Sequence, residues 1–330
     1  MTPRTLLAGL GDERKGCGPL IAPLSETTRP LRQQVFDRVR AAGLIPRVQV
    51  AKELGVSPAS VTTITQELIE AGLIEEASAP REGDQGRGRP AVALCVRSAA
   101  HLVAGMKLSD REHTAVVVDS SGNLVAGDVI PRRPGPMSLP ELLAAIETLL
   151  HRVCAKAGIE PANLTALGLG VPGFVDCQSG MVMWSSVLLE RGVALAQAAT
   201  THLGLPVHVD NDANLVTLAE LWFGAGRALA DFAVVTIEHG VGMGCVINHR
   251  IYRGAKGLGM ELGHTKVQLD GALCRCGQRG CLEAYVADYA LAREATTALN
   301  WGHKESQPIN VLLESLYDHA KAGNSTARSI

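Results

Sequence analysis

Residues 261–283 read ELGHTKVQLDGALCRCGQRGCLE and bring one imidazole and three thiols into a short stretch. Nine residues separate His264 from Cys274, one separates Cys274 from Cys276, and four separate Cys276 from Cys281. Glycines interleave with these residues and let the backbone turn around an ion. One imidazole with three thiolates forms a closed tetrahedral ligand set, so the spacing predicts a structural zinc site rather than a hydrolytic one. The alternative is a loop that holds three reduced cysteines.

A second polar stretch, DNDAN at residues 210–214, closes a strand-like run and opens a helical one. Its clustered carboxylates and carboxamides can bind hydroxyl groups in pairs, although a helix cap followed by a turn explains the same pattern. Further upstream, Gly168–Asp176 reads as a strand running into a Gly/Pro loop, where the backbone can approach a ligand closely. Gly240–Gly244 follows another strand and either lies near a phosphate or forms a tight turn.

The sequence around these motifs alternates between strand-like and helical runs. The strand-like runs lie at residues 114–119, 166–170, 207–210 and 233–237, and a long helical pattern covers 139–157. Ser120–Asn123 reads as a hairpin turn. This alternation indicates an α/β body from residue 98 onward.

Toward the N-terminus, RVQVAKELGVSPASVTTI at residues 47–64 reads as helix, tight turn, helix. Gly55 can take the positive φ of the turn, Ser57 is a suitable N-cap, and Pro58 stands at the first helical position. Another helix, beginning near residue 29 and ending at Gly43, precedes them. The helix that begins at Pro58 is the candidate recognition helix, because short hydroxyls and one amide face outward from it. Its predicted DNA-contacting residues are Ser57, Ala59, Ser60, Thr62, Thr63 and Gln66.

A β-hairpin follows the candidate recognition helix. One strand begins at Leu73, a polar Gly-rich loop covers residues 81–90, and the chain returns as a strand over 92–96. The loop carries Arg87 and Arg89 on either side of a glycine, and such arginines can enter a narrow, electronegative minor groove. The alternative for this loop is a solvated basic turn. We predict a winged helix-turn-helix whose wing binds DNA through Arg87 and Arg89.

Composition limits the remaining possibilities. The hydrophobic fraction of 46% supports a sizeable core, while the net charge of −2 means that nucleic-acid binding depends on local basic clusters. No apolar run has the length of a membrane span and no signal-peptide core is evident. We therefore expect a cytoplasmic protein whose eight cysteines form no disulfides. The expected domains are a flexible tail (1–27), the DNA-binding domain (28–97) and the α/β domain (98–330).

From about residue 29 to its end the chain resembles the ROK family, named for repressors, open reading frames and sugar kinases. The motifs that carry the resemblance are ELGH at 261–264 with the three cysteines and Glu283, and DNDAN at 210–214 with Glu220. The resemblance implies an α/β, actin-like, sugar-kinase-like two-lobed ATPase fold, preceded by the winged helix-turn-helix domain of the repressor branch. Relative to the family this fold is C-terminally incomplete, because only 49 residues, 282–330, follow Cys281.

The resemblance also assigns roles to individual residues of the body. Asp212 matches the catalytic base of the family's kinases. His264 would direct one ring nitrogen to zinc and the other toward a sugar, since the metal fixes the tautomer. The implied sugar-binding residues are Gly173, Asn211, Asp212, Glu261, His264 and Glu283.

Two departures from the family's pattern argue against kinase activity. Phosphoryl transfer needs a phosphate cradle as well as a base, and the family's kinases carry Asp-Leu-Gly-Gly-Thr after the first strand of the body. Here that stretch is Lys107–Arg111 (KLSDR), and Glu238-His239 stands where a Gly-Thr pair is usual. We therefore expect no enzymatic activity, with Asp212 as a vestigial base that accepts an effector hydroxyl.

The sequence thus favours a transcriptional regulator, a repressor of sugar-metabolism genes. Its expected partners are a double-stranded DNA operator and a sugar or sugar-phosphate effector. A homodimer or homotetramer would place two recognition helices about one DNA turn apart. Two alternatives stay open. One is a ROK-type kinase with a vestigial head that phosphorylates a hexose or amino sugar, and the other is a regulator that binds a protein partner instead of a sugar.

Overall fold

Contacts between residues divide the protein into two units. The computed structural model of the 330-residue chain describes residues 16–20, 29–78, 92–255, 257, 259–301 and 307–330. Unit 1 comprises Met1–Phe232 and Val246–Ile251, and unit 2 comprises Ala233–Cys245 and Tyr252–Ile330. Within the described ranges no helix is both long and apolar enough to cross a membrane.

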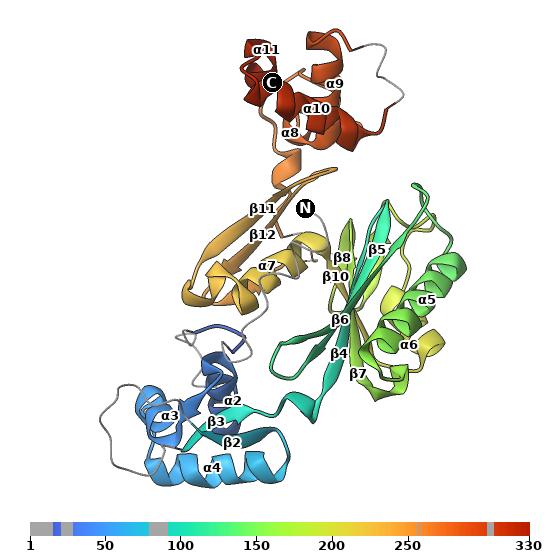
Figure 1. Ribbon diagram of the computed structural model, residues 1–330. Coiled ribbons are helices and arrows are strands. Elements are labelled where there is room, and N and C mark those ends of the chain that lie inside the picture. Colours follow the sequence, from blue (N-terminus) through green and yellow to red (C-terminus); the bar gives the residue numbers. More distant parts are fainter. Residues whose placement is uncertain (1–15, 21–28, 79–91, 256, 258, 302–306) are drawn as a thin grey trace. The chain divides into compact units, whose positions relative to one another are not determined.

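The N-terminal head of unit 1 consists of three helices and a three-stranded sheet in the order β1-β3-β2 (Figure 1). Its elements are α2 (Leu31–Ala42), β1 (Ile45–Pro46), α3 (Arg47–Leu54), α4 (Pro58–Glu70), β2 (Ile74–Ser78) and β3 (Val92–Val96). β3 pairs antiparallel with both β1 and β2. This arrangement confirms the predicted winged helix-turn-helix, and α4 is the helix that the sequence proposed for DNA recognition.

Local sequence explains the turn between α3 and α4. Gly55 has a φ of +65°, in the left-handed region, and lets the chain reverse there. Ser57 Oγ accepts a hydrogen bond from the backbone N of Ser60 (3.1 Å), and Pro58 begins the helix, both as predicted. Val61 of the next turn is fully buried and anchors α4 in the core of the head.

Five residues of the expected flexible tail, 16–20, are described and have defined partners. Cys17 is 3% exposed, and its backbone N donates to the carbonyl of Arg40 at the end of α2 (3.0 Å). The backbone N of Gly18 donates to the carbonyl of Trp222 (2.8 Å). The expectation of a loose tail is therefore wrong for this stretch. It rested on missing periodicity, which carries no information about contacts with distant residues.

The first lobe of the body, also in unit 1, is built on a five-stranded sheet in the order β10-β7-β4-β5-β6. Neighbouring strands of the group β10-β7-β4 are parallel, whereas β4, β5 and β6 form an antiparallel meander. The predicted hairpin turn at residues 120–123 joins β5 to β6. The strands are β4 (Leu102–Leu108), β5 (Glu112–Asp119), β6 (Leu124–Pro131), β7 (Leu164–Val171) and β10 (Val207–Asn211).

Helices α5 (Leu139–Ala157) and α6 (Leu195–Leu203) cover one face of this sheet (Figure 1). α5 begins at a capping box formed by Ser138 and Glu141 and buries an apolar stripe that includes Ile146. That stripe shares one core with the central strand β7. The core fixes the sheet and therefore the loops at its edge.

The remaining elements of this lobe include the β8-β9 hairpin and α7, which follow the carboxyl ends of β7 and β10. β7 and β10 are parallel neighbours with Asn211 opposite Val171, so the loop after β7 lies beside the start of α7. The elements are the β8 (Phe174–Asp176) and β9 (Met181–Trp184) hairpin, α7 (Asp212–Phe223), and the 3-10 turns η2 (Ser98–Ala100), η3 (Pro161–Asn163) and η4 (Ala225–Ala228).

The rest of the chain forms a small sheet and a group of C-terminal helices. The sheet has the order β11 (Phe232–Ile237), β12 (Val241–Ile247) and β13 (Arg250–Tyr252). The 3-10 turn η5 (Leu262–His264) follows, then the helices α8 (Glu283–Val286), α9 (Asp288–Ala298), α10 (Ile309–Lys321) and α11 (Ser325–Ser329). Residues 265–282 contain no helix or named strand, only the isolated bridges Lys266–Cys281 and Leu273–Arg279. Backbone hydrogen bonds such as those from Cys274 N to the carbonyl of Gln278 (2.8 Å) and from Leu282 N to that of Thr265 (2.9 Å) shape this stretch.

Candidate functional site

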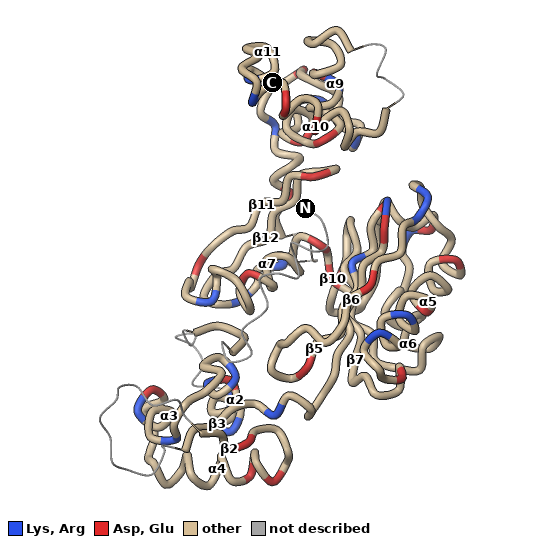
Figure 2. The backbone as a smooth tube through the Cα atoms, viewed as in Figure 1, with Lys and Arg blue, Asp and Glu red and all other residues tan. Residues whose placement is uncertain are grey.

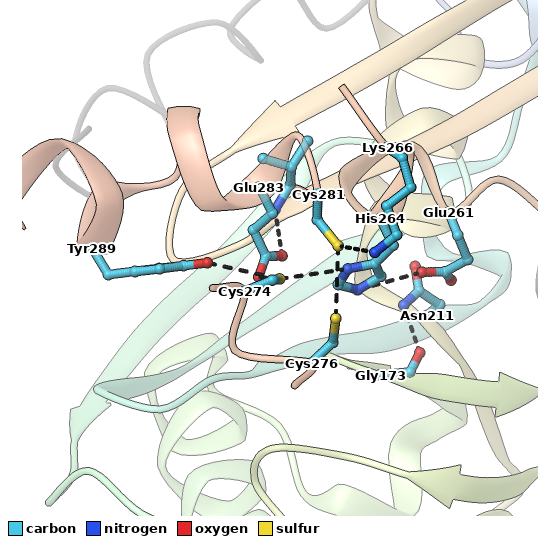
Figure 3. A network of polar contacts seen from close by, with 11 residues as sticks. Gly173, Asn211, Glu261, His264, Lys266, Cys274, Cys276, Cys281, Glu283 and Tyr289 are labelled. Carbon is cyan, nitrogen blue, oxygen red and sulfur yellow. Dashed lines mark hydrogen bonds and ion pairs between the residues drawn. The ribbon is translucent and has the colours of Figure 1, made fainter. Parts of the chain in front are cut away.

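Unit 2 brings the four predicted metal ligands together (Figure 3). The ligand atoms of His264, Cys274, Cys276 and Cys281 all lie within 4.8 Å of one another. Cys274 Sγ is 3.8 Å from His264 Nδ1, and Cys276 Sγ is 3.8 Å from Cys281 Sγ. Thiolates that bind one zinc ion tetrahedrally at about 2.3 Å lie about 3.8 Å apart, so these separations fit such an ion.

Burial opposes negative charge on the sulfurs of this cluster. It raises the pKa of the Cys274 thiol to about 12. At Cys281 burial acts in the same direction, but hydrogen bonds from Lys266 and His264 outweigh it and lower the pKa to about 7. Lys266 Nζ lies 3.0 Å from Cys281 Sγ (Figure 3). A divalent cation is the charge that lets all three thiols ionise together. Sequence reasoning missed Lys266, because only folding brings it to Cys281.

The two acidic residues of unit 2 that the resemblance assigns to a sugar have different surroundings. Glu283 is 8% exposed, and its carboxylate accepts hydrogen bonds from the backbone N of Val241 (3.2 Å) and from Cys274 Sγ (3.4 Å). It therefore ties the cysteine loop to the start of β12. The Glu261 side chain is 49% exposed, and its Oε2 lies 3.9 Å from His264 Nε2. The ring nitrogen that faces away from the sulfurs is thus Nε2, beside an accessible carboxylate.

In unit 1, Asn211 lies at the start of α7, where both polar atoms of its side chain form hydrogen bonds. Oδ1 accepts hydrogen bonds from two backbone N–H groups of the first turn (2.9 and 3.3 Å), and Nδ2 donates to the carbonyl of Gly173 (2.8 Å; Figure 3). Gly173 has a φ of +116°, and a Cβ there would lie 2.3 Å from the carbonyl oxygen of Trp184, so only glycine fits. The helix cap that the DNDAN motif allowed is present. A hydroxyl group would meet the second Nδ2 hydrogen and the adjacent Asp212.

The turn between β4 and β5 contains most of the stretch 107–111 that the resemblance compares with a kinase phosphate loop. The backbone N of Ser109 donates to His113 Nδ1 (3.3 Å), and its carbonyl accepts from Arg132 Nη1 (3.1 Å). Burial and the nearby Arg132 lower the pKa of His113 to about 4, so the ring is neutral and Nδ1 can accept this bond. The backbone groups of Ser109 are therefore engaged within the protein.

The predicted DNA-contacting residues of α4 are at the surface of the head, with Ser60 half-buried. The exposed residues are Ser57, Ala59, Thr62, Thr63 and Gln66. The hydroxyls of Thr62 and Thr63 donate to the carbonyls of Pro58 (2.9 Å) and Ala59 (3.2 Å), one turn earlier. Figure 2 shows that α4 carries neither Lys nor Arg, so phosphate contacts by a basic side chain must come from elsewhere in the head. Arg87 and Arg89 lie outside the described residues.

A polar network that the sequence did not suggest joins the elements of the head. Arg47 Nε donates to Thr65 Oγ1 (3.0 Å), and Arg47 Nη2 pairs with Glu76 Oε1 (2.7 Å). Thr65 is fully buried. These three residues connect α3, α4 and β2, and so fix the recognition helix against the base of the wing.

Two sequence profiles match the chain. The one described as "ROK family" matches residues 103–330, and the one described as "Winged helix-turn-helix DNA-binding" matches residues 31–75. The first covers most of the chain, and the second falls on the head.

Individual relatives combine the same two parts. The chain is 29% identical over 299 residues to the DNA-binding transcriptional dual regulator NagC of Escherichia coli strain K12, covering 90% of the chain and 72% of NagC. It is 31% identical over 253 residues to the xylose repressor of Caldicellulosiruptor bescii, covering 75% and 61%.

Solved structures give the same result. A ROK family transcriptional regulator, described as a homologue of the E. coli MLC protein, matches with a TM-score of 0.71 and 28% identity over 90% of this chain and 74% of that one. A ROK family glucokinase from Streptomyces griseus, in complex with glucose and AMPPNP, matches with a TM-score of 0.58 and 28% identity, covering 68% and 73%. The match to the regulator includes the head, whereas the kinase matches a smaller part of the chain.

Proposed function

Because this chain belongs to the ROK family, we propose that it is a sugar-responsive transcriptional repressor that acts on DNA in the cytoplasm. The observation that carries the proposal is the coexistence of a complete helix-turn-helix, with α4 exposed, and a body related to both sugar-responsive regulators and sugar kinases. The named repressors of N-acetylglucosamine and xylose among its relatives support a sugar-derived signal.

The proposed effector is a sugar or sugar phosphate. The residues that would bind it are Gly173, Asn211 and Asp212 of unit 1 and Glu261, His264 and Glu283 of unit 2. Support comes from the geometry within each unit: Asn211 and Asp212 begin α7 next to Gly173, and Glu261 lies beside His264 Nε2. Carboxylates and amides are the groups that pair with sugar hydroxyls, and a metal on Nδ1 would hold the His264 ring in one orientation.

The proposal includes a structural Zn²⁺ ion on His264, Cys274, Cys276 and Cys281. When bound, the ion would supply the positive charge that the buried thiolates need, and the closed ligand set leaves no position for a substrate. Glu283 Oε1 lies 3.4 Å from Cys274 Sγ, so the metal site and an effector residue of unit 2 are adjacent.

Regulation without phosphoryl transfer is part of the same proposal. Lys107 begins the stretch in which family kinases have a glycine-rich loop, and the Ser109 backbone is engaged by His113 and Arg132. Glu238 adds negative charge at the turn before β12, where its carboxylate would repel the phosphates of a nucleotide. Asp212 would then accept a hydrogen bond from the effector instead of removing its proton.

The direct test measures operator affinity in the presence of sugars. The wild-type protein selects its operator from a random DNA pool, and fluorescence anisotropy then follows binding over a panel of monosaccharides and their phosphates. We expect one sugar to change the dissociation constant at least about fivefold. Asp212→Asn should remove this response, whereas Asp318→Asn on the exposed surface of α10 should keep it. ATP turnover over the same panel would favour the kinase, and operator binding indifferent to every sugar would favour a protein-responsive regulator.

A separate prediction concerns the wing. Arg89→Ala should weaken operator binding and reduce the slope of log K against log salt by about one, because one phosphate-neutralising contact is lost. The wing matters especially here because α4 carries no basic side chain. Arg191→Ala, at an exposed arginine of unit 1, is the matched control. An unchanged salt slope in Arg89→Ala would contradict a DNA contact by the wing.

A further inference from the structure

The end of α7 is joined to the head by a dense set of contacts within unit 1. The guanidinium of Arg40, in the last turn of α2, lies 4.3 Å from the ring centre of Trp222 in α7. Arg227, just beyond α7, donates from Nη2 to the carbonyl of Ala41 (2.5 Å) and from Nε to the carbonyl of Gly18 (2.9 Å). The body therefore supplies a cation to the C-terminal carbonyls of α2, the helix end that such a charge stabilises.

Residues 16–18 fill the space between the two helices closely. The backbone N of Cys17 donates to the carbonyl of Arg40, and a Cβ on Gly16 would lie 2.5 Å from that same oxygen. A Cβ on Gly122, in the turn between β5 and β6, would lie 2.8 Å from the Phe223 ring and 3.1 Å from Cys17. Such contacts leave no room for α2 and α7 to slide independently.

A second attachment connects the head to the sheet rather than to α7. Ser121 Oγ, in the turn after β5, donates to the carbonyl of Val96 at the end of β3 (3.2 Å) and lies 2.9 Å from Ser98 Oγ. The head thus has two attachments: the base of the wing is held by the sheet, and the end of α2 is held by α7. A shift of α7 along the sheet would therefore move the end of α2 relative to the base of the wing.

Helix α7 begins at the effector residues and ends at this junction. It has 12 residues, so it spans about 18 Å from Asp212 to Phe223. We propose that α7 is the element that couples the effector residues at its start to the DNA-binding head at its end, through Trp222 and Arg227. This inference rests on the proposed function for the identity of the effector. The coupling between the two ends of α7 can be tested without an effector.

The physical step at the effector end is a change in the partners of Asn211. Its Nδ2 holds the loop after β7 through the carbonyl of Gly173, while its Oδ1 caps α7. A hydroxyl group that takes over the Nδ2 bond releases the first turn of α7 from that loop. A short helix packed at both ends moves as a body, and shifts of about 1–2 Å are typical of such switches. The displacement therefore reaches Arg40 and Ala41.

A double-mutant cycle tests the coupling without any sugar. Asn211→Asp keeps a good N-cap but places a carboxylate oxygen against the Gly173 carbonyl, which breaks the bond between them. Arg227→Gln removes the guanidinium from the end of α2. We expect Asn211→Asp to change the dissociation constant for the selected operator at least about fivefold in the wild-type background. In the Arg227→Gln background the effect of Asn211→Asp should fall below about twofold. If the two sites were independent, Asn211→Asp would have the same effect in both backgrounds.

The control background is Arg191→Gln, which removes an exposed arginine of the same unit and should leave the effect of Asn211→Asp intact. Trp222→Leu provides a second junction variant that keeps the Trp222 carbonyl, the acceptor of the Gly18 backbone N. An equal effect of Asn211→Asp in the wild-type and junction backgrounds overturns the proposal. So does an operator affinity that Asn211→Asp leaves unchanged.

Hydrogen exchange covers the case in which the junction variants do not fold. In the otherwise wild-type chain, Asn211→Asp should change the exchange rate of the backbone amide of Gly43, which closes the end of α2. Unchanged exchange at this amide would also overturn the coupling. The sugar panel tests the proposed effector independently. If no sugar binds, the proposed effector is wrong, but the double-mutant cycle still decides whether α7 couples Asn211 to the head.

Discussion

Replacing Cys281 with serine should weaken zinc binding about 100-fold and loosen residues 262–287. A structural zinc site contributes about 10–16 kcal/mol through four ligands, so one ligand accounts for roughly 3 kcal/mol, or about two orders of magnitude in affinity. Serine does not ionise at neutral pH, and the cation of Lys266, 3.0 Å from the sulfur, would lose its negative partner. Competition with a chromophoric chelator measures the affinity.

The loop should loosen because its apolar core is small and residues 265–282 contain no helix or named strand. Its buried apolar cluster contains only Cys274, Cys281 and Ala284, with Ala272 and Tyr285 packed against it. So small a core cannot order about 25 residues on its own. Hydrogen exchange should therefore accelerate across the loop in Cys281→Ser and in wild-type protein treated with chelator.

The matched control for this experiment is Cys245→Ser in β12. Cys245 belongs to the same unit but is not one of the four clustered ligands. This variant should keep one zinc ion and wild-type exchange. Wild-type protein that is free of zinc by elemental analysis, yet equally protected from exchange, would contradict the metal site.

Thr63→Glu should weaken operator binding about 100-fold or more while leaving the stability of the head unchanged. Thr63 is exposed on α4, and a carboxylate there would face the DNA phosphates across the groove, a juxtaposition that costs several kcal/mol. No Lys or Arg within α4 offsets the added charge. Glutamate is a better helix former than threonine, so the helix itself should not suffer. Anisotropy with the selected operator measures the effect, and thermal unfolding measures the stability.

Thr297→Glu on α9 is a closely matched control. Thr297 is exposed in a helix, and its hydroxyl donates to the carbonyl of Arg293 (3.1 Å), as the hydroxyl of Thr63 does to that of Ala59 (3.2 Å). Both variants add the same charge to the chain, so only the position differs. Equal loss of operator binding in the two would show that net charge, rather than the recognition helix, is responsible.

The sequence by itself determined the features that depend on neighbouring residues. Gly55, Ser57 and Pro58 predict the turn and the start of α4 because φ preference and capping act within a few residues. The cluster of His264 and the three cysteines could be predicted for the same reason, since these residues share one loop. The alternation of strands and helices predicted an α/β body, and the family motifs predicted its sugar-kinase-like fold.

The tertiary structure alone decided how distant residues are used. Asn211 proved to be both the cap of α7 and the partner of Gly173, 38 residues earlier, so a motif that suggested hydroxyl binding also has a structural role. Lys266 became the partner of a cysteine 15 residues away.

Residues 16–20, which have no periodicity, bridge the head and α7, and Arg227 reaches a carbonyl 209 residues before it. No local pattern could reveal such a contact. A hydrogen bond between remote residues depends on where the whole chain packs, and neither residue's neighbours in sequence change when it forms. The sequence therefore predicted the head and the metal loop as separate parts. Only the folded chain showed that α7, which starts at Asp212, ends against α2 of the head.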